Sequence, residues 1–240
     1  MIPKIIHYCW FGKGQMPELV ERCIASWHEH MPNWEYQLWC EDNFDINAAP
    51  RYVQEAYAAK KYAFVSDYVR LWALEREGGL YMDVDFEVYR PYDDLMEKYD
   101  AFAGYEGSKR NPVMMGVIAA KAHHPWIQGI LQTYKSRRFL QEDGSLDMTP
   151  NTGYFLHWMQ ERGFEADGKE KDFMGVHILP VECFCPVLTT GENLRSERTY
   201  CEHKGLHSWS GNGGWKAKVL KLFRPTIRVM LIKFKRTVFG

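Results

Sequence analysis

The chain has 240 residues, of which 46% are hydrophobic and 25% are charged, and its formal net charge is −1. This balance is typical of one globular domain, or of one domain with a small appendage, with a full hydrophobic core. No repeat or low-complexity segment is present, and no run of about 18 uninterrupted apolar residues occurs, so no membrane-spanning helix is expected.

The N-terminal residues are typical of a β-α-β unit. Residues 2–10 form an apolar strand candidate, residues 17–30 a helix candidate and residues 34–39 a second strand candidate. Gly12 and Gly14 lack the third glycine of a dinucleotide-binding fingerprint, so a Rossmann site is not expected. A β-α-β beginning predicts an α/β protein with a parallel sheet.

A long helical region is expected over residues 51–77, as one helix or two, and the Gly78-Gly79 pair ends it. Asp67 falls on the apolar stripe of this region, where a carboxylate must be paired or must line a site. Arg70, three residues later, can pair with it on the same helix. The pattern predicts either a structural ion pair or part of a binding site.

Residues 80–88 alternate in polarity and are predicted to form one strand. Asp83 and Asp85 are two positions apart, so an extended chain points both carboxylates to one side. Two neighbouring anionic oxygens suit a hard divalent cation. The alternative is a strand end with two solvated aspartates, since a lone D-x-D triplet is weakly specific.

Strands and helices continue to alternate in the second half of the chain. The polar residues 141–150 predict a mobile loop, and Asn151 opens a helix. Free backbone N–H groups at a helix start can meet an anion or a sugar hydroxyl, but Asn151 can also be a plain cap. The further expected elements are strands over 101–105, 113–119 and 176–181, a short acidic helix after Pro91, and helices over 125–138 and 153–162.

Six cysteines are present, and the N-terminal stretch MIPKIIHYCWFG is too polar for a signal peptide. Reduced thiols in a cytoplasmic protein are therefore expected. Zinc bound by Cys183, Cys185, Cys201 and His203 is an alternative, although their spacing is not a standard zinc pattern. Residues 200–215, YCEHKGLHSWSGNGGW, place histidines and a Ser-Trp pair in a glycine-rich loop that has few core duties. These histidines are either functional or simply exposed.

The run SDYVRLWALEREGGLYMDVD, residues 66–85, fits the long pattern S-D-x-x-R-x-x-x-L-x-x-x-G-G-x-Y-x-D-x-D. It resembles the core block of family 32 glycosyltransferases, which include bacterial capsular-polysaccharide and lipooligosaccharide sugar transferases. The resemblance covers roughly residues 2–215 and implies a GT-A-like α/β fold with a mixed, mostly parallel central sheet flanked by helices. Residues 1–215 would then form the catalytic domain.

The resemblance also implies a site for Mn²⁺ or Mg²⁺. Asp85 would bind the metal directly, and Asp83 would reach the ribose or a metal-bound water. His203 best matches the late metal-binding histidine of the family, with His207 as the alternative. Carboxylate oxygens and a neutral imidazole are suitable ligands for such a cation.

A nucleotide-sugar pocket follows from the same resemblance. Trp10 would stack on the base with His7 close by. Asp67 would hold sugar hydroxyls, while Arg70 would balance its charge and contact the donor. The remaining donor contacts would come from Asn151, Ser208 and Trp209.

The expected activity is transfer of a hexose from a nucleotide-diphospho sugar, with a UDP-sugar favoured, to a glycan or lipid-linked saccharide acceptor. The resemblance implies retention of the anomeric configuration and a role in bacterial surface-polysaccharide biosynthesis. Two alternatives stay open. A haloacid-dehalogenase-type phosphohydrolase also carries D-x-D after an apolar strand, and a sugar-binding module could use the same fold without catalysis.

Residues 216–240 differ from the rest in charge. They contain eight Lys or Arg and no acid, which leaves 22 basic against 31 acidic residues elsewhere. Basic residues beside apolar ones suit an anionic membrane surface, so a basic amphipathic tail at the inner face of the cell membrane is expected. The alternative is a tail that packs on the domain. The acidic body argues against a nucleic-acid partner.

Overall fold

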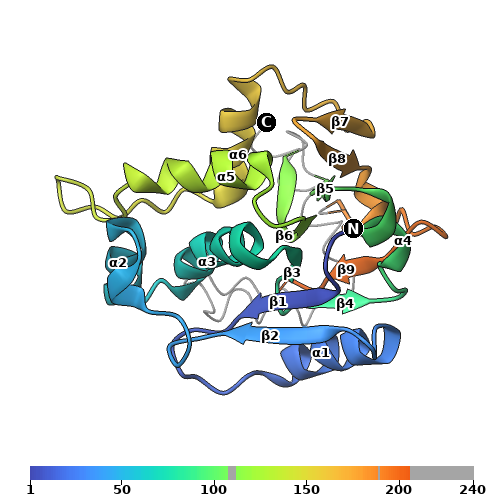
Figure 1. The fold of residues 1–240 in the computed structure, drawn as a ribbon, viewed down its shortest axis with the longest axis horizontal. Helices are drawn as coiled ribbons and strands as arrows, with labels where there is room; N and C mark the ends of the chain where they lie inside the picture. Colours follow the sequence, from blue (N-terminus) through green and yellow to red (C-terminus); the bar gives the residue numbers. More distant parts are fainter. Residues whose placement is uncertain (108–111, 189, 206–240) are drawn as a thin grey trace, which may run out of the picture.

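The computed structural model describes residues 1–107, 112–188 and 190–205. Within them, a seven-stranded sheet of order β2-β1-β3-β6-β5-β8-β7 forms the centre of the molecule (Figure 1). Five of its strands run in one direction, and β6 and β7 run against them. The strands are β1 (Ile5–Cys9), β2 (Glu35–Trp39), β3 (Gly79–Met82), β5 (Ala101–Tyr105), β6 (Val113–Ala120), β7 (Lys171–Phe173) and β8 (Val176–Leu179).

Helices flank this sheet, and two hydrophobic cores lie on its opposite faces. Helices α2 (Arg51–Ala58), α3 (Tyr62–Glu77), α5 (Pro125–Gln132) and α6 (Asn151–Gln160) pack in one core. The other core holds α1 (Glu18–His30), α4 (Asp93–Lys98) and a small second sheet of β4 (Phe86–Val88) and β9 (Cys201–His203). Short 3-10 turns span Ile46–Ala48, Thr133–Lys135 and Val181–Cys183. The α/β architecture that the resemblance implies is confirmed.

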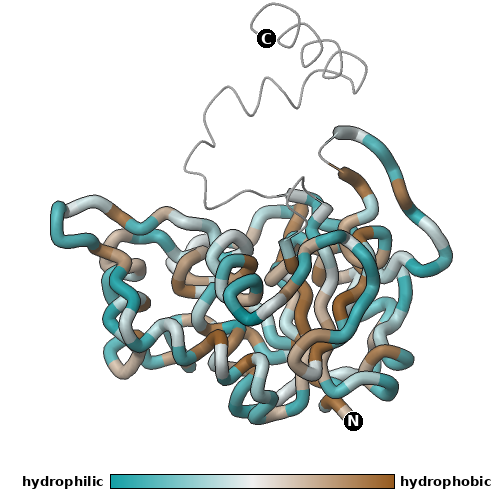
Figure 2. Tube along the Cα trace, turned by 90° about the horizontal axis from the view of Figure 1, so that it is seen from above, coloured by the Kyte–Doolittle hydropathy of each residue, from teal (hydrophilic) through white to brown (hydrophobic). Residues whose placement is uncertain are grey.

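Strand β3 shows how the sequence divides between the two cores. Leu80 and Met82 face the core that contains α1, and Tyr81 faces the core that contains α3. All three are buried, because successive side chains of a strand point to opposite faces and this sheet is covered on both. In Figure 2, hydrophobic segments lie mostly inside the molecule, and hydrophilic segments lie mostly around them.

The N-terminal β-α-β unit is confirmed, with β1 and β2 paired in parallel. The region 51–77 is two helices, separated by Lys60 in a left-handed conformation (φ 57°). The prediction of one strand over residues 80–88 is wrong. The chain leaves the central sheet after Met82 and turns, with the Phe86 amide donating to the Asp83 carbonyl at 3.2 Å. β4 then pairs with β9 in the second sheet.

Two glycines set the angle between α3 and β3. Gly78 and Gly79 have φ values of 68° and 113°, which side chains rarely adopt. A Cβ on Gly79 would lie 2.7 Å from the Ile5 carbonyl oxygen, so β3 can approach β1 only because this position lacks a side chain. The pair therefore directs the chain from the helix into the sheet, toward Asp83.

The pairing of β5 with β6 is irregular at the level of the site. The register shifts between Ala103, which pairs with Ile118, and Tyr105, which pairs with Val113. Such bulges redirect backbone groups and are common next to functional sites. Here the carbonyl of Gly116 accepts a hydrogen bond of 2.8 Å from the Asp83 amide. The carbonyl of Met115 accepts one of 2.6 Å from Arg70.

No helix in the described part of the chain has both the length and the apolarity to cross a membrane. The predicted boundary at residue 215 and the predicted tail over 216–240 lie outside the described residues.

Candidate active site

A pocket of about 700 Å³ opens where β1, β3 and β6 meet the N-terminal ends of α3 and α6. It brings together five of the predicted site residues from separate segments: Trp10, Asp67, Arg70, Asp83 and Asp85. Asn151 and His203 also line it, although they lie far from the first group in the chain. Ligands of α/β proteins commonly bind in crevices at strand ends of this kind.

Arg70 is the buried hub of this pocket. Its Nη2 lies 2.8 Å from Asp67 Oδ1 and 3.3 Å from Asp83 Oδ1. Its other nitrogens donate to the carbonyls of Met115, at 2.6 Å, and Ser66, at 3.2 Å. Burial lowers the pKa of Arg70, but Asp83 and the other anions around it raise it further, so the guanidinium stays charged. The predicted pairing of Asp67 with Arg70 is therefore present, and it includes Asp83 as well.

Asp67 joins α3 to the start of α6. Asn151 Nδ2 donates to Asp67 Oδ1 at 2.6 Å, so Asn151 is not a plain helix cap. Burial raises the pKa of Asp67 to about 6, against the opposing effect of Arg70. Both partners bind Oδ1, and among the described residues Oδ2 has no hydrogen-bond or ion-pair partner. One oxygen of a positioned carboxylate thus remains available to a ligand.

Asp83 is held on three sides. The Tyr81 hydroxyl donates to its Oδ1 at 2.7 Å, Arg70 lies beside both oxygens, and Gly116 packs beneath it. A Cβ on Gly116 would come within 2.8 Å of Asp83 Oδ2, so a glycine is needed at this point of the pocket floor. Burial raises the pKa of Asp83, and Arg70 opposes that effect. Tyr81 was not among the predicted site residues, because its alternation pattern marks it only as part of a strand face.

Asp85 meets His203 across the second sheet. His203 Nε2 donates to Asp85 Oδ2 at 3.1 Å, and Phe86 is its partner in the β4–β9 pairing. The Phe86 and His203 rings stack with centroids 4.7 Å apart. Burial lowers the pKa of His203, but the hydrogen bond and charge of Asp85 raise it by more. The structure thus places the Asp85 carboxyl group and the His203 imidazole side by side.

The side chains of Asp85 and His203 suit a divalent cation that takes most of its ligands from a bound substrate and from water. Asp85 offers carboxylate oxygens, and His203 offers an imidazole nitrogen once its proton leaves. Three His, Cys, Asp or Glu side chains do not come together as a metal cage anywhere in residues 1–107, 112–188 and 190–205. Asp83 is already committed to Arg70 and Tyr81. Asp85 and His203 would thus hold the cation, with phosphate oxygens and water completing its shell.

His7 does not lie where the resemblance implies. It is fully buried, its Nε2 donates to the Gly78 carbonyl at 2.8 Å, and its Nδ1 accepts from the Trp39 indole at 3.2 Å. Burial lowers the pKa of His7, which keeps the ring neutral. Both ring nitrogens are used inside the protein, so the predicted contact of His7 with a donor is wrong. The ring supports the Gly78-Gly79 turn instead.

Trp10 is half-buried, and its indole donates to the Gly14 carbonyl at 2.6 Å while its ring lines the pocket. Lys60 and Lys61, from the turn between α2 and α3, line the same pocket, and no pattern in the sequence marked them as site residues. The other candidates, His207, Ser208 and Trp209, lie outside the described residues.

The zinc alternative has no support in the structure. Cys183, Cys185 and Cys201 are buried free thiols. The Cys185 thiol contacts the Met114 sulfur at 3.3 Å, and the Cys201 thiol contacts the Phe184 carbonyl at 3.6 Å. These cysteines are part of the core beneath β9, while the neighbouring His203 points to Asp85.

The α/β fold of this chain thus places paired carboxylates, a buried arginine and an imidazole around one pocket. Residues 17–102 match a family model described as a glycosyltransferase sugar-binding region containing a DXD motif. Residues 17–102 are thus similar to the sugar-binding region of DXD-motif glycosyltransferases, and Asp83-Val84-Asp85 is the D-x-D triplet within them.

Two curated proteins are similar to this chain. An uncharacterized glycosyltransferase of Acanthamoeba polyphaga mimivirus is 27% identical over 162 residues, which cover 64% of this chain and 62% of that protein. Inositol phosphoceramide mannosyltransferase 3 of Schizosaccharomyces pombe is 26% identical over 134 residues, which cover 55% of this chain and 36% of that protein. The match thus spans less than two thirds of the length of either relative.

Among solved structures, the PaToxG glycosyltransferase aligns with 68% of this chain and 71% of its own. The TM-score is 0.47 and the sequence identity is 17%.

Proposed function

We propose that the protein transfers a hexose from a nucleotide-diphospho sugar to a glycan or glycolipid acceptor, with Mn²⁺ or Mg²⁺ bound at Asp85 and His203. The observation that carries the proposal is the convergence of two charged clusters on one pocket. Asp67, Arg70 and Asp83 form one cluster, and Asp85 and His203 form the other. The family match to residues 17–102 supports the assignment to sugar transfer.

The first cluster suits the sugar. Asp67 Oδ2 can accept from a sugar hydroxyl, while Arg70 and Asn151 fix the carboxylate through Oδ1. Positioning of this kind lowers the entropic cost of reaching a reactive geometry. Asp83, anchored by Tyr81 and Arg70, can accept from a ribose hydroxyl or a bound water with its remaining lone pairs.

The second cluster suits the diphosphate. A bound divalent cation offsets the charge of a leaving diphosphate. The side chains of Asp85 and His203 would bind and orient it, and His203 would release its Nε2 proton in doing so. Lys60 and Lys61 add positive charge to the same pocket, which suits an anionic donor.

Retention of the anomeric configuration, which the family resemblance implies, would proceed here without a covalent enzyme intermediate. Asp67 and Asp83 both face Arg70, which stabilises their charge and lowers their nucleophilicity. Such carboxylates suit hydroxyl binding better than attack on an anomeric carbon. We therefore propose departure and attack on the same face of the sugar, assisted by the leaving phosphate.

A UDP-sugar is the donor we favour. The acceptor class rests on the same proposal, and the relative named inositol phosphoceramide mannosyltransferase 3 supports a lipid-containing acceptor. The role in bacterial surface-polysaccharide assembly stays a prediction of the sequence.

The test is a panel of nucleotide-diphospho sugars incubated with the full chain and Mn²⁺, with nucleoside diphosphate release as the signal. Wild type is compared with Asp85→Asn, and with Asp100→Asn as a matched control, since Asp100 pairs with Lys121 on the surface at 2.5 Å. Release that depends on metal, and on Asp85 but not Asp100, supports the proposal.

The same assay separates the alternatives. Donor binding without release would favour a non-catalytic sugar-binding module. Release of inorganic phosphate from simple phosphate esters would favour a phosphohydrolase. If no donor in the panel binds or turns over, the proposed function is wrong.

A further inference from the structure

The two strands that hold Asp85 and His203 together form a very short ladder. β4 and β9 pair over three residues each, and Phe86, next to Asp85, is the partner of His203. Two-stranded ladders are marginal in water without additional support. The next residue pair should destabilise the ladder further, because Glu87 lies directly opposite Glu202 and like charges at such positions repel.

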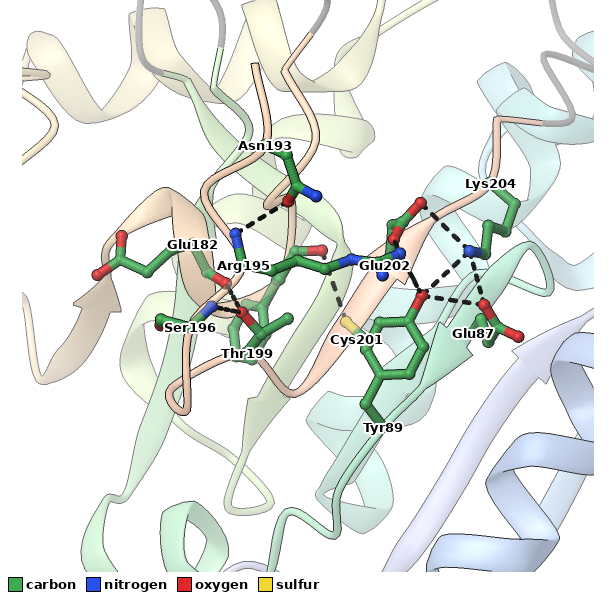
Figure 3. Close-up of polar contacts among 11 residues, drawn as sticks. Glu87, Tyr89, Glu182, Asn193, Arg195, Ser196, Thr199, Cys201, Glu202 and Lys204 are labelled. Atoms are coloured by element: carbon green, nitrogen blue, oxygen red, sulfur yellow. Dashed lines mark hydrogen bonds and ion pairs between the residues drawn. The ribbon is translucent and has the colours of Figure 1, made fainter. Parts of the chain in front are cut away.

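In a charge network on this face of the ladder, positively charged side chains offset that repulsion (Figure 3). Lys204 Nζ lies 2.6 Å from Glu87 and 3.2 Å from Glu202, and Arg195 forms a second ion pair with Glu202. Figure 3 shows these side chains gathered around the hydroxyl of Tyr89. That oxygen lies 2.9 Å from each glutamate, 2.9 Å from Arg195 and 3.0 Å from Lys204.

The network and the site occupy opposite faces of the same ladder. Glu202 in β9 and Lys204, the residue after β9, flank His203 on the chain, so they point away from the face on which His203 stacks on Phe86. A slip of one residue would exchange the two faces and turn His203 away from Asp85. The backbone agrees with the observed register, since the Lys204 amide donates to the Asp85 carbonyl at 2.8 Å.

We propose that this network is a register clamp, which fixes the pairing of β4 with β9 and thereby positions His203 against Asp85. The clamp consists of Glu87, Tyr89, Arg195, Glu202 and Lys204. Its residues are positioning residues, because they act through His203 and Asp85. The inference rests on the proposed function for the use of that pair as a metal site, but the register itself can be tested without metal.

The decisive variant is Lys204→Glu in the full chain. It would place three carboxylates in the network with Arg195 as their remaining cation within it. Hydrogen exchange followed by mass spectrometry should show about tenfold faster exchange in the segment 199–205, because the local ladder opens more often. Adding Glu87→Lys to Lys204→Glu exchanges the two charges and should bring exchange back near the wild-type rate.

The matched control is Lys121→Glu, which breaks the surface pair with Asp100. It should leave exchange in the segment 199–205 unchanged. Equal acceleration in this control, or no acceleration in Lys204→Glu, would overturn the clamp. If Lys204→Glu does not fold, Tyr89→Phe serves instead, and exchange at the wild-type rate in that variant would equally overturn it.

Mn²⁺ binding, measured by electron paramagnetic resonance without any donor, separates positioning from simple electrostatics. A carboxylate added near the site would strengthen Mn²⁺ binding through its charge alone. The clamp predicts the opposite, a weakening of about 10- to 100-fold, as is typical when outer partners of metal ligands are lost. The charge-exchanged double variant should recover binding. If wild type binds no Mn²⁺ while the exchange pattern holds, the proposed metal site fails and the clamp stands.

Discussion

His203 Nε2 lies 3.1 Å from Asp85 Oδ2, although 118 residues separate the two in the chain. The contact exists because β9 pairs with β4 just beyond the D-x-D triplet. Neither residue is part of the seven-stranded sheet. The proposed metal site therefore lies beside the small second sheet, while the proposed sugar-binding residues Asp67 and Arg70 lie on α3.

Replacing Asp85 should remove metal-dependent activity. We expect Asp85→Asn to lower nucleoside diphosphate release roughly 100-fold or more, since even outer partners of metal ligands cost 10- to 100-fold. Circular dichroism should show an unchanged fold, because Asp85 lies in a turn outside the central sheet. Full activity of wild type in excess EDTA would contradict the prediction.

Asp67 should impose an acidic limit on donor binding. With its pKa raised to about 6, the carboxylate is protonated as the pH falls through this value and can no longer accept freely from a hydroxyl. Titration calorimetry should find donor binding roughly tenfold weaker at pH 5 than on the plateau above pH 7. The Asp67→Asn variant should bind the donor weakly at every pH, without the fall in affinity at acid pH. An identical pH profile in both proteins would assign Asp67 a structural role alone.

The same pKa has a consequence for stability, with a definite sign. Because the folded state holds the proton of Asp67 more tightly than the unfolded state, the contribution of Asp67 to the free energy of unfolding falls as the pH rises from about 4 to about 6. Urea unfolding of wild type and Asp67→Asn across this range isolates the effect. A difference between the two proteins that grows with rising pH is expected.

Arg70→Met should be strongly destabilising. It leaves Asp67 and Asp83 buried without their cation, at a cost of roughly 3–5 kcal/mol in the free energy of unfolding. The loss should shrink at acid pH, where both carboxylates can be protonated. Arg76→Met is the control on the same helix, because Arg76 is exposed and only stacks on Trp72, so about 1 kcal/mol or less is expected. Similar losses from the two variants would argue against a hub role for Arg70.

Replacing His7 should lower the stability of the fold and leave the affinity for the nucleotide-sugar donor unchanged. His7→Phe leaves the Gly78 carbonyl and the Trp39 indole without their partners, at roughly 1–3 kcal/mol for each buried group. Donor affinity of the folded fraction should stay at the wild-type value. A selective loss of donor affinity with normal stability would restore the original assignment of His7 to the donor pocket.

The basic tail over residues 216–240 should bind anionic membranes. Each Lys or Arg near the lipid is worth about 1 kcal/mol, and the tail holds eight of them. The full chain should co-sediment with phosphatidylserine-containing vesicles at low salt more than a chain ending at Trp215. Neutral vesicles are the control, and equal sedimentation of both proteins would reject the membrane role.

The sequence predicted local features well, because their causes are local. Helical spacing placed Asp67 and Arg70 together, glycines marked the end of α3, and the apolar strands were found near their actual bounds. The alternation over residues 80–88 led to the wrong prediction of one long strand. Two short strands of different sheets separated by a turn show the same period in the sequence.

Other parts of the site depend on contacts that a single sequence does not encode locally. The carbonyl of Met115 reaches Arg70 through a bulge, and bulges have no reliable residue pattern. Asn151 was identified as a candidate, but its hydrogen bond to Asp67 depends on how α6 packs. His7 was misplaced because a histidine at the end of an apolar strand looks the same whether it lines a pocket or fills a core.

The order of the elements along the chain has a consequence for synthesis. β8, the last strand to join the seven-stranded sheet, ends at Leu179, and β9 follows more than twenty residues later. Chains emerge from the ribosome N-terminus first, so the large sheet and α3, which carries Asp67 and Arg70, can assemble before His203 has emerged. A nascent chain at that stage would hold Asp67 and Arg70 on α3 and would still lack its imidazole. The arrival of one short strand would then bring His203 to Asp85.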